Sequence, residues 1–172
     1  MPQARNNEQL RRMLMPKIQE TVEYLMNQIY QHNKYLIEKM VYDAFMPEEY
    51  QRTYEFEEAW TYDAPKGKRA ISGNHVKMEF KYSPEELYTY DPPIHGSFIP
   101  GWGEARDYLA DLIYQGDSGP LYGDGPWRKK RDAWSQLIKE LGKKNFYRYL
   151  EDGFTYAGLK VKRKSTARRK KQ

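Results

Sequence analysis

A long amphipathic segment dominates the first third of the chain. Residues 16–45 predict a helix, with Pro16 in its first turn and an end before Pro47, because proline disfavours helix at the residue before it. Residues 8–14 are only weakly periodic and are expected to form a separate helical turn. The apolar residues that define the long helix recur at spacings of three, four and seven, typical of one buried face: Ile18, Val22, Leu25, Ile29, Leu36 and Met40.

Residues 75–82 change to a two-residue alternation, which is typical of a half-buried antiparallel strand. A turn rich in small residues ahead of it leaves room for a short strand at 69–72. A further strand is expected around Trp60 and Tyr62, although the acidic residues 55–59 would also suit a helical turn. The face of 75–82 that is expected to be buried carries Val76, Met78, Phe80 and Tyr82.

The second half of the chain is predicted to consist of long loops around two helices. Residues 104–114 predict a short helix, and residues 127–150 predict a long one. Asp152-Gly153 is expected to end the long helix, and residues 154–161 are expected to add a last short strand. Loops of this length inside a domain are more often functional than spare.

These elements predict an α+β fold. A long N-terminal helix and a long C-terminal helix pack on a small antiparallel sheet, joined by long loops and followed by a disordered basic C-terminal arm. Residues 1–15 are expected to be an N-terminal extension, 16–159 a single α+β domain and 160–172 a basic tail. The expected core contact brings Trp134, Leu137 and Leu141 against Val76, Met78 and Phe80.

The charge of the chain is concentrated at its C-terminus. The formal net charge is +5, from 29 basic and 24 acidic residues. Removing the eight cations of residues 160–172 leaves 21 basic against 24 acidic residues, a net charge of −3 for the body. Such a segment suits non-specific DNA contact, an acidic protein partner or a solubility role, and it is expected to be disordered when free. Its cations are Lys160, Lys162, Arg163, Lys164, Arg168, Arg169, Lys170 and Lys171.

Composition gives little support for catalysis or for a membrane segment. The chain has no cysteine, which removes disulfides, thiolate metal sites and thiol nucleophiles, and its three histidines lie far apart. Asp107 and Asp111 lie one helical turn apart without a third ligand, so we expect a solvated face. We therefore expect no enzyme activity, no metal and no cofactor. No apolar run approaches the length of a membrane span, and the N-terminus lacks the apolar core of a signal peptide.

The carboxylates Glu48, Glu49, Glu55, Glu57 and Glu58 are expected to form a solvated or subunit-contact surface.

Aromatic residues are unusually abundant. Tyrosine alone occurs 16 times, and aromatics make up 15% of the chain, which is more than one small core needs. Tyrosine and tryptophan are enriched at protein interfaces. We therefore expect loops 83–103 and 115–126 to contact neighbouring subunits through Tyr88, Tyr90, Phe98, Trp102 and Tyr122.

Three short passages of the chain together resemble a known family of proteins. The first is the end of the long helix running through residues 42–56, where Tyr50-Gln51-Arg52-Thr53 matches a Tyr-x-Arg-Thr turn before a first strand. The family usually has glycine after Arg-Thr, whereas this chain has Tyr54. The other passages are His95-Gly96-Ser97-Phe98 in a central loop, and Gly123-Asp124-Gly125-Pro126-Trp127-Arg128 before the last helix.

With these three passages the chain resembles the head–tail joining, or tail-completion, proteins of the necks of long-tailed bacteriophages. The resemblance implies a structural virion protein made in the host cytoplasm and located at the head–tail interface, where loops 83–103 and 115–126 would also meet neighbouring rings. Such proteins form a homo-oligomeric ring, expected to be six- or twelve-fold, through which DNA passes. The implied neighbours are portal or adaptor proteins on one side and tail-tube or tail-terminator proteins on the other.

Two other functions stay open from the residues alone. One is a non-specific nucleic-acid-binding protein that acts through its basic C-terminal arm, although the body is net acidic. The other is a small enzyme whose only candidate groups are loop carboxylates and His95. The oligomeric size of the purified protein and its appearance in electron micrographs would separate these from a ring subunit.

Overall fold

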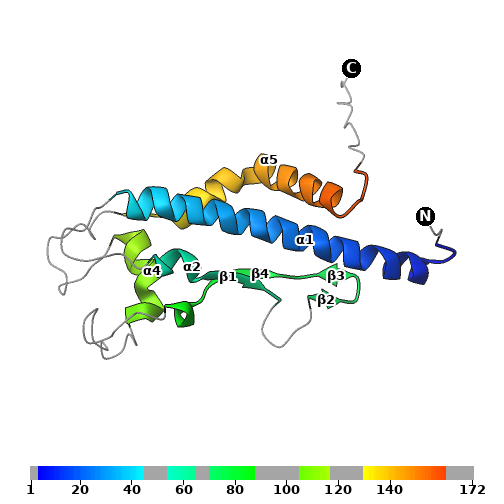
Figure 1. Cartoon of the computed structure of the whole chain (residues 1–172), viewed down its shortest axis with the longest axis horizontal. Helices are drawn as coiled ribbons and strands as arrows, with labels where there is room; N and C mark the ends of the chain where they lie inside the picture. The colour runs from blue at the N-terminus through cyan, green and yellow to red at the C-terminus, as the bar shows by residue number, and fades with distance from the viewer. Residues whose placement is uncertain (1–3, 45–53, 65–69, 88–104, 117–129, 162–172) are drawn as a thin grey trace, which may run out of the picture.

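One long helix runs through the whole molecule (Figure 1). The computed structural model describes residues 4–44, 54–64, 70–87, 105–116 and 130–161. The elements follow in this order: α1 (Asn7–Ile37), the π-helical turn η1 (Glu38–Tyr42), α2 (Glu55–Glu58), β1 (Trp60–Asp63), β2 (Ile71–Ser72), β3 (His75–Val76), β4 (Glu79–Tyr82), the 3₁₀ turn η2 (Pro84–Glu86), α4 (Ala105–Gln115) and α5 (Ala133–Tyr156).

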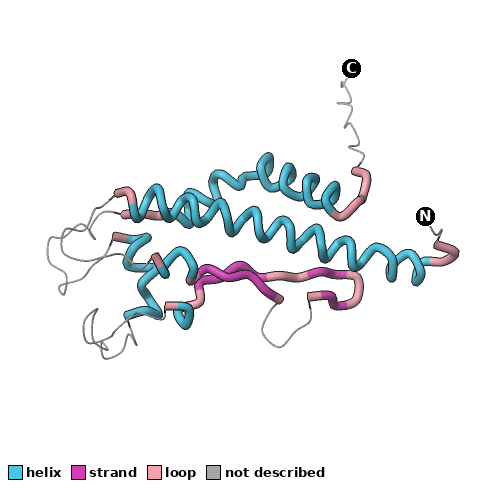
Figure 2. The backbone as a smooth tube through the Cα atoms, viewed as in Figure 1, coloured by secondary structure: helices cyan, strands magenta, loops and turns pink. Residues whose placement is uncertain are grey.

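The elements form layers on either side of α1. Helix α5 lies along one side of α1, and the strands lie along the other, as the tube view shows (Figure 2). Helix α4 lies beside the strands near the C-terminal end of α1. The predicted α+β class, with two long helices and a small antiparallel sheet, is confirmed.

Helix α1 begins earlier than the sequence predicted. Asn6 caps it, because its side-chain oxygen accepts a 2.8 Å hydrogen bond from the Gln9 N–H. Residues 7–15 therefore belong to α1 and form neither a separate turn nor an extension, and Pro16 lies inside the helix. Proline there removes one backbone hydrogen bond, the one toward the Arg12 carbonyl. The cap and an ion pair between Glu8 and Arg12 support the turns before it.

The strands form two antiparallel pairs. In the first, β1 pairs with β4 and sets Trp60 opposite Tyr82. In the second, β2 pairs with β3 through a turn at Gly73, whose φ of 60° favours glycine. The predicted alternation over 75–82 is confirmed, since even positions are half-buried and odd positions exposed. The strand is nevertheless interrupted at Lys77 and Met78, between β3, which pairs with β2, and β4, which pairs with β1.

The core is an aromatic cluster between the helices and β1. The Trp60 ring stacks on Trp134 of α5 at a centroid distance of 5.3 Å, and Phe80 stacks on the same Trp134 at 6.0 Å. Leu137 is completely buried, while Trp134 and Leu141 are partly buried against the cluster. The predicted contact between this helix and Phe80 is confirmed. Val76 was expected to contact the same helix, but it lies on β3, which packs against α1.

Helix α5 differs from its prediction at both ends. Residues 130–132 are not helical, and the helix begins at Ala133 because the Asp132 carboxylate caps it by accepting from the Ser135 N–H at 2.8 Å. It runs past Gly153 to Tyr156, so the strand predicted at 154–161 is wrong. Its backbone breaks once, at Gly142, where φ is 29° and ψ is 172°.

Candidate functional site

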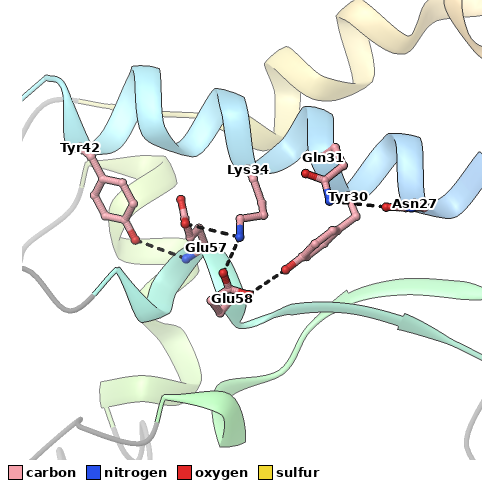
Figure 3. A network of polar contacts seen from close by, with 7 residues as sticks. All are labelled: Asn27, Tyr30, Gln31, Lys34, Tyr42, Glu57 and Glu58. Atoms are coloured by element: carbon pink, nitrogen blue, oxygen red, sulfur yellow. Dashed lines mark hydrogen bonds and ion pairs between the residues drawn. The ribbon is translucent and has the colours of Figure 1, made fainter.

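A polar network joins α1 to α2 (Figure 3). The Lys34 ammonium pairs with the Glu57 carboxylate at 3.5 Å and also with the carboxylate of Glu58. The Tyr30 hydroxyl donates to Glu58 at 2.9 Å, and the Tyr42 hydroxyl accepts the Glu57 N–H at 3.3 Å. One ammonium thus serves two carboxylates, so the network keeps a negative charge. Its geometry holds α2 against the C-terminal part of α1.

The two carboxylates of this network differ in their surroundings. The Glu58 side chain is 57% exposed, and hydrogen bonds from Lys34 and then Tyr30 lower the pKa of its carboxyl. The Glu57 side chain is 19% exposed, and burial raises its pKa although Lys34 acts in the opposite direction. The expectation of a wholly solvated or subunit-contact surface is therefore wrong for Glu57, which pairs within its own chain. Glu48 and Glu49 lie outside the described residues.

The turn into α2 has an unusual backbone. Tyr54 has φ 61° and ψ 9°, and no other non-glycine residue in the described part of the chain has a positive φ. This left-handed conformation costs an ordinary side chain about 1–2 kcal/mol. The Tyr54 ring meets Tyr42 edge-on at a centroid distance of 4.9 Å, and this contact offsets part of the cost. The side chain is still half exposed.

His32 lies at the seam between α1 and α5. Its Nε2 is 2.7 Å from the Glu140 carboxylate, and the Tyr149 hydroxyl is 3.4 Å from its Nδ1. Hydrogen bonds from Gln136 and then from His32 lower the pKa of the Glu140 carboxyl. The His32 side chain is 14% exposed. The imidazole joins α1 to residues on both sides of the break in α5.

The break at Gly142 divides α5 into a proximal half, residues 133–141, and a distal half, residues 143–156. A Cβ atom at Gly142 would meet nothing within 4 Å, so the break is not imposed by crowding. The Asn145 side-chain amide donates to the Glu140 carbonyl, which the break deprives of its regular helical partner.

The distal half of α5 is seated closely on α1. A Cβ atom at Gly153 would come within 2.9 Å of the Thr21 carbonyl oxygen, so this approach requires glycine. The Thr21 hydroxyl contacts the Gly153 carbonyl at 3.4 Å, and the Tyr24 and Tyr156 rings stack at a centroid distance of 5.1 Å. Beyond the helix end, the Lys17 ammonium donates to the Ala157 carbonyl at 2.6 Å.

Most of the predicted contact residues lie outside the described ranges. This holds for the five loop aromatics, Tyr88, Tyr90, Phe98, Trp102 and Tyr122, and for the basic residues from Lys162 onward. Lys160 is described and is exposed just after α5.

Asp107 and Asp111 are both exposed on α4. No three histidine, aspartate or glutamate residues within the described ranges are grouped as metal ligands. None of the helices described there is both long and apolar enough to cross a membrane.

Sequence reasoning did not identify the two glycines that shape α5. Gly153 was expected to end the helix. A glycine is also required where two helices approach closely, as Gly153 of α5 and Thr21 of α1 do. Gly142 gave a usable signal, since a glycine in a helix interior marks a possible break.

Comparison with known proteins found no matching family, no matching curated protein and no matching solved structure.

Proposed function

We propose that this chain is a structural subunit of a phage neck. Copies form a ring between the portal or adaptor complex and the tail, and DNA passes through the opening. The basic segment from Lys160 onward contacts the DNA or an acidic neighbour. The resemblance of three passages to neck proteins is the starting point of this proposal.

The observation that carries the proposal is the backbone at Tyr54. Residue 54 follows Arg52-Thr53, the position at which the similar neck proteins usually have glycine. Glycine is the residue that adopts a left-handed conformation without steric cost, and Tyr54 adopts that conformation with φ 61°. The tyrosine therefore occupies a glycine-type turn, which supports the resemblance at the point where the sequence departs from it.

The shape of the molecule also suits a ring subunit. Helix α1 has 31 residues and spans about 46 Å. Helix α5 is packed along it, which makes the pair a rigid two-helix unit. A subunit built on such a unit can form head-to-tail contacts that close into a ring.

Assembly of the purified chain tests the proposal. Sedimentation velocity and negative-stain electron microscopy would follow the chain alone and with the portal and tail proteins encoded beside it. We expect closed rings that form with those partners or at high concentration. A chain that stays monomeric and binds none of them would contradict the proposal. Salt-sensitive DNA binding by that monomer would favour the nucleic-acid-binding alternative.

Variants at residue 54 connect this experiment to the turn. Tyr54→Gly keeps the left-handed backbone and should assemble as the parent does. Tyr54→Val places a β-branched side chain where positive φ is strongly disfavoured and should reduce assembly. Equal assembly of the two variants would remove the turn as support for the proposal.

A further inference from the structure

The two halves of α5 differ in what holds them. The proximal half belongs to the core, where Ala133 and Leu137 are completely buried and Trp134 stacks on β1 and β4. The distal half contacts α1 through Thr21, Tyr24 and His32, and the Ala157 carbonyl directly after it accepts from Lys17. Tyr149 and Leu150 of the distal half also pack against the core cluster, so in an exchange the neighbouring copy would supply these two side chains.

A single residue connects the two halves. Gly142 carries the whole departure from helical geometry, and the space around it is open. Rotation at this one residue to helical φ and ψ would restore the backbone hydrogen bonds that the break removes. It would also turn the distal half, roughly 21 Å long, away from its own α1. Gly142 is therefore placed as a hinge.

Large apolar side chains flank this hinge and face solvent. Ile138 is 54% exposed, and Phe146 and Tyr147, which contact each other, are 39% and 59% exposed. A single copy leaves them uncovered. Two copies joined through straightened α5 helices would bring their hinge regions together, which gives these side chains an apolar partner surface.

We propose that the distal half of α5 is exchanged between copies, so that each copy places residues 143–156, with Ala157 directly after them, on the α1 of its neighbour. The inference rests on the proposed ring and deepens it. Exchange reproduces the Thr21–Gly153, Tyr24–Tyr156 and Lys17–Ala157 contacts between chains, so only the hinge differs from the single copy. Each subunit donates one half-helix and receives one, which is the head-to-tail connection that a closed ring requires.

Substitution of the hinge gives the first test. Gly142→Ala strains the broken conformation, because side chains rarely adopt its φ, and favours a continuous helix. We expect the assembled fraction at fixed concentration to rise about fivefold or more in sedimentation velocity. Gly73→Ala is the matched control: residue 73 also has positive φ and open surroundings, but it lies in the β2–β3 turn, so the substitution strains that turn and should leave the assembled fraction unchanged. An unchanged or lower assembled fraction for Gly142→Ala would overturn the hinge.

Crosslinking identifies which chain supplies the half-helix. The chain has no cysteine, so Tyr24→Cys and Tyr156→Cys each introduce one thiol. The two variants are mixed under assembly conditions and treated with a short bismaleimide. Exchange predicts a covalent dimer in the mixture, well above the yield from either variant alone. A chain carrying both substitutions controls for reach. Crosslinks that form within that chain, with none in the mixture, would overturn the proposal.

The two proposals fail separately. Rings that assemble without mixed crosslinks would end the exchange and leave the ring intact. Mixed crosslinks in dimers that never close or bind neck partners would support the exchange and contradict the proposed function.

Discussion

Asn33 is a polar side chain placed where an apolar one would be expected. It is completely buried on α1, and neither atom of its amide has a hydrogen-bond partner within the part of the chain that the structure describes. An unpaired buried polar group costs about 1–3 kcal/mol. Asn33→Leu, similar in size, should therefore raise the free energy of unfolding by about 1–3 kcal/mol in urea denaturation.

Thr21→Val is the control for that prediction. Thr21 is equally buried, but its hydroxyl donates to the Lys17 carbonyl at 2.8 Å. Removing a satisfied hydroxyl should leave stability unchanged or lower it by about 1 kcal/mol. A loss of stability in Asn33→Leu as well would mean that the asparagine amide is satisfied in solution.

At the scale of elements, the proximal half of α5 should be the strongest attachment between layers. Leu137 is completely buried, whereas its neighbour Ile138 is more than half exposed. Leu137→Ala should lower the free energy of unfolding by about 2–5 kcal/mol, because it leaves a cavity in a packed core. Ile138→Ala should cost less than about 0.5 kcal/mol in the monomer. Similar losses for both variants would show that this face of α5 is assigned incorrectly.

The N-terminus of α5 should give stability a defined pH dependence. Burial alone would raise the pKa of Asp132, but hydrogen bonds from Ser135 and Lys130 outweigh it, so the pKa is lowered. A lowered pKa contributes stability above the pKa of the unfolded chain, and that stability is lost as pH falls through the folded pKa. Asp132→Ala should cost about 1 kcal/mol near pH 7 and progressively less below about pH 4.

Asp132→Asn is the matched control for the cap. It keeps an oxygen acceptor for the Ser135 N–H without a titrating group, so its stability relative to Asp132→Ala should not vary with pH across the acid range. Urea denaturation at several pH values measures both differences. A constant difference between the parent and Asp132→Ala would contradict the assignment of this carboxylate as the titrating cap.

The sequence predicted the elements better than their boundaries. Helical periodicity from residue 16 and alternation over 75–82 follow from which face is buried. The structure has the first pattern up to Tyr42, in α1 and η1, and the second over all of 75–82; Phe45 lies outside the described residues. The start of α1 depends on the Asn6 cap, and the continuation of α5 past Gly153 brings that glycine into close contact with Thr21. That contact joins residues far apart in sequence, so local patterns could not predict it. The pairing of His32 with Glu140 could not be predicted for the same reason.

For the whole molecule, the basic C-terminal segment should be separable from the fold. Lys160 and Val161 are exposed, and the last buried residue that the structure describes is Ala157, directly after α5. A chain ending at Leu159 should keep its melting temperature while losing most of its affinity for duplex DNA. For the full chain, log K should fall by about 0.9 per phosphate neutralised for each tenfold rise in salt. Equal DNA affinity of the two chains would exclude the segment as the DNA contact.

The stacking of Trp60 on Trp134 has an optical consequence. The indoles come from β1 and α5, their centroids are 5.3 Å apart and their planes differ by 16°. Rings this close couple their electronic transitions, so the pair should produce an exciton signal in circular dichroism. That signal depends on the strand layer and α5 remaining in contact. The protein thus carries an intrinsic, label-free reporter of whether these two layers stay together as copies assemble.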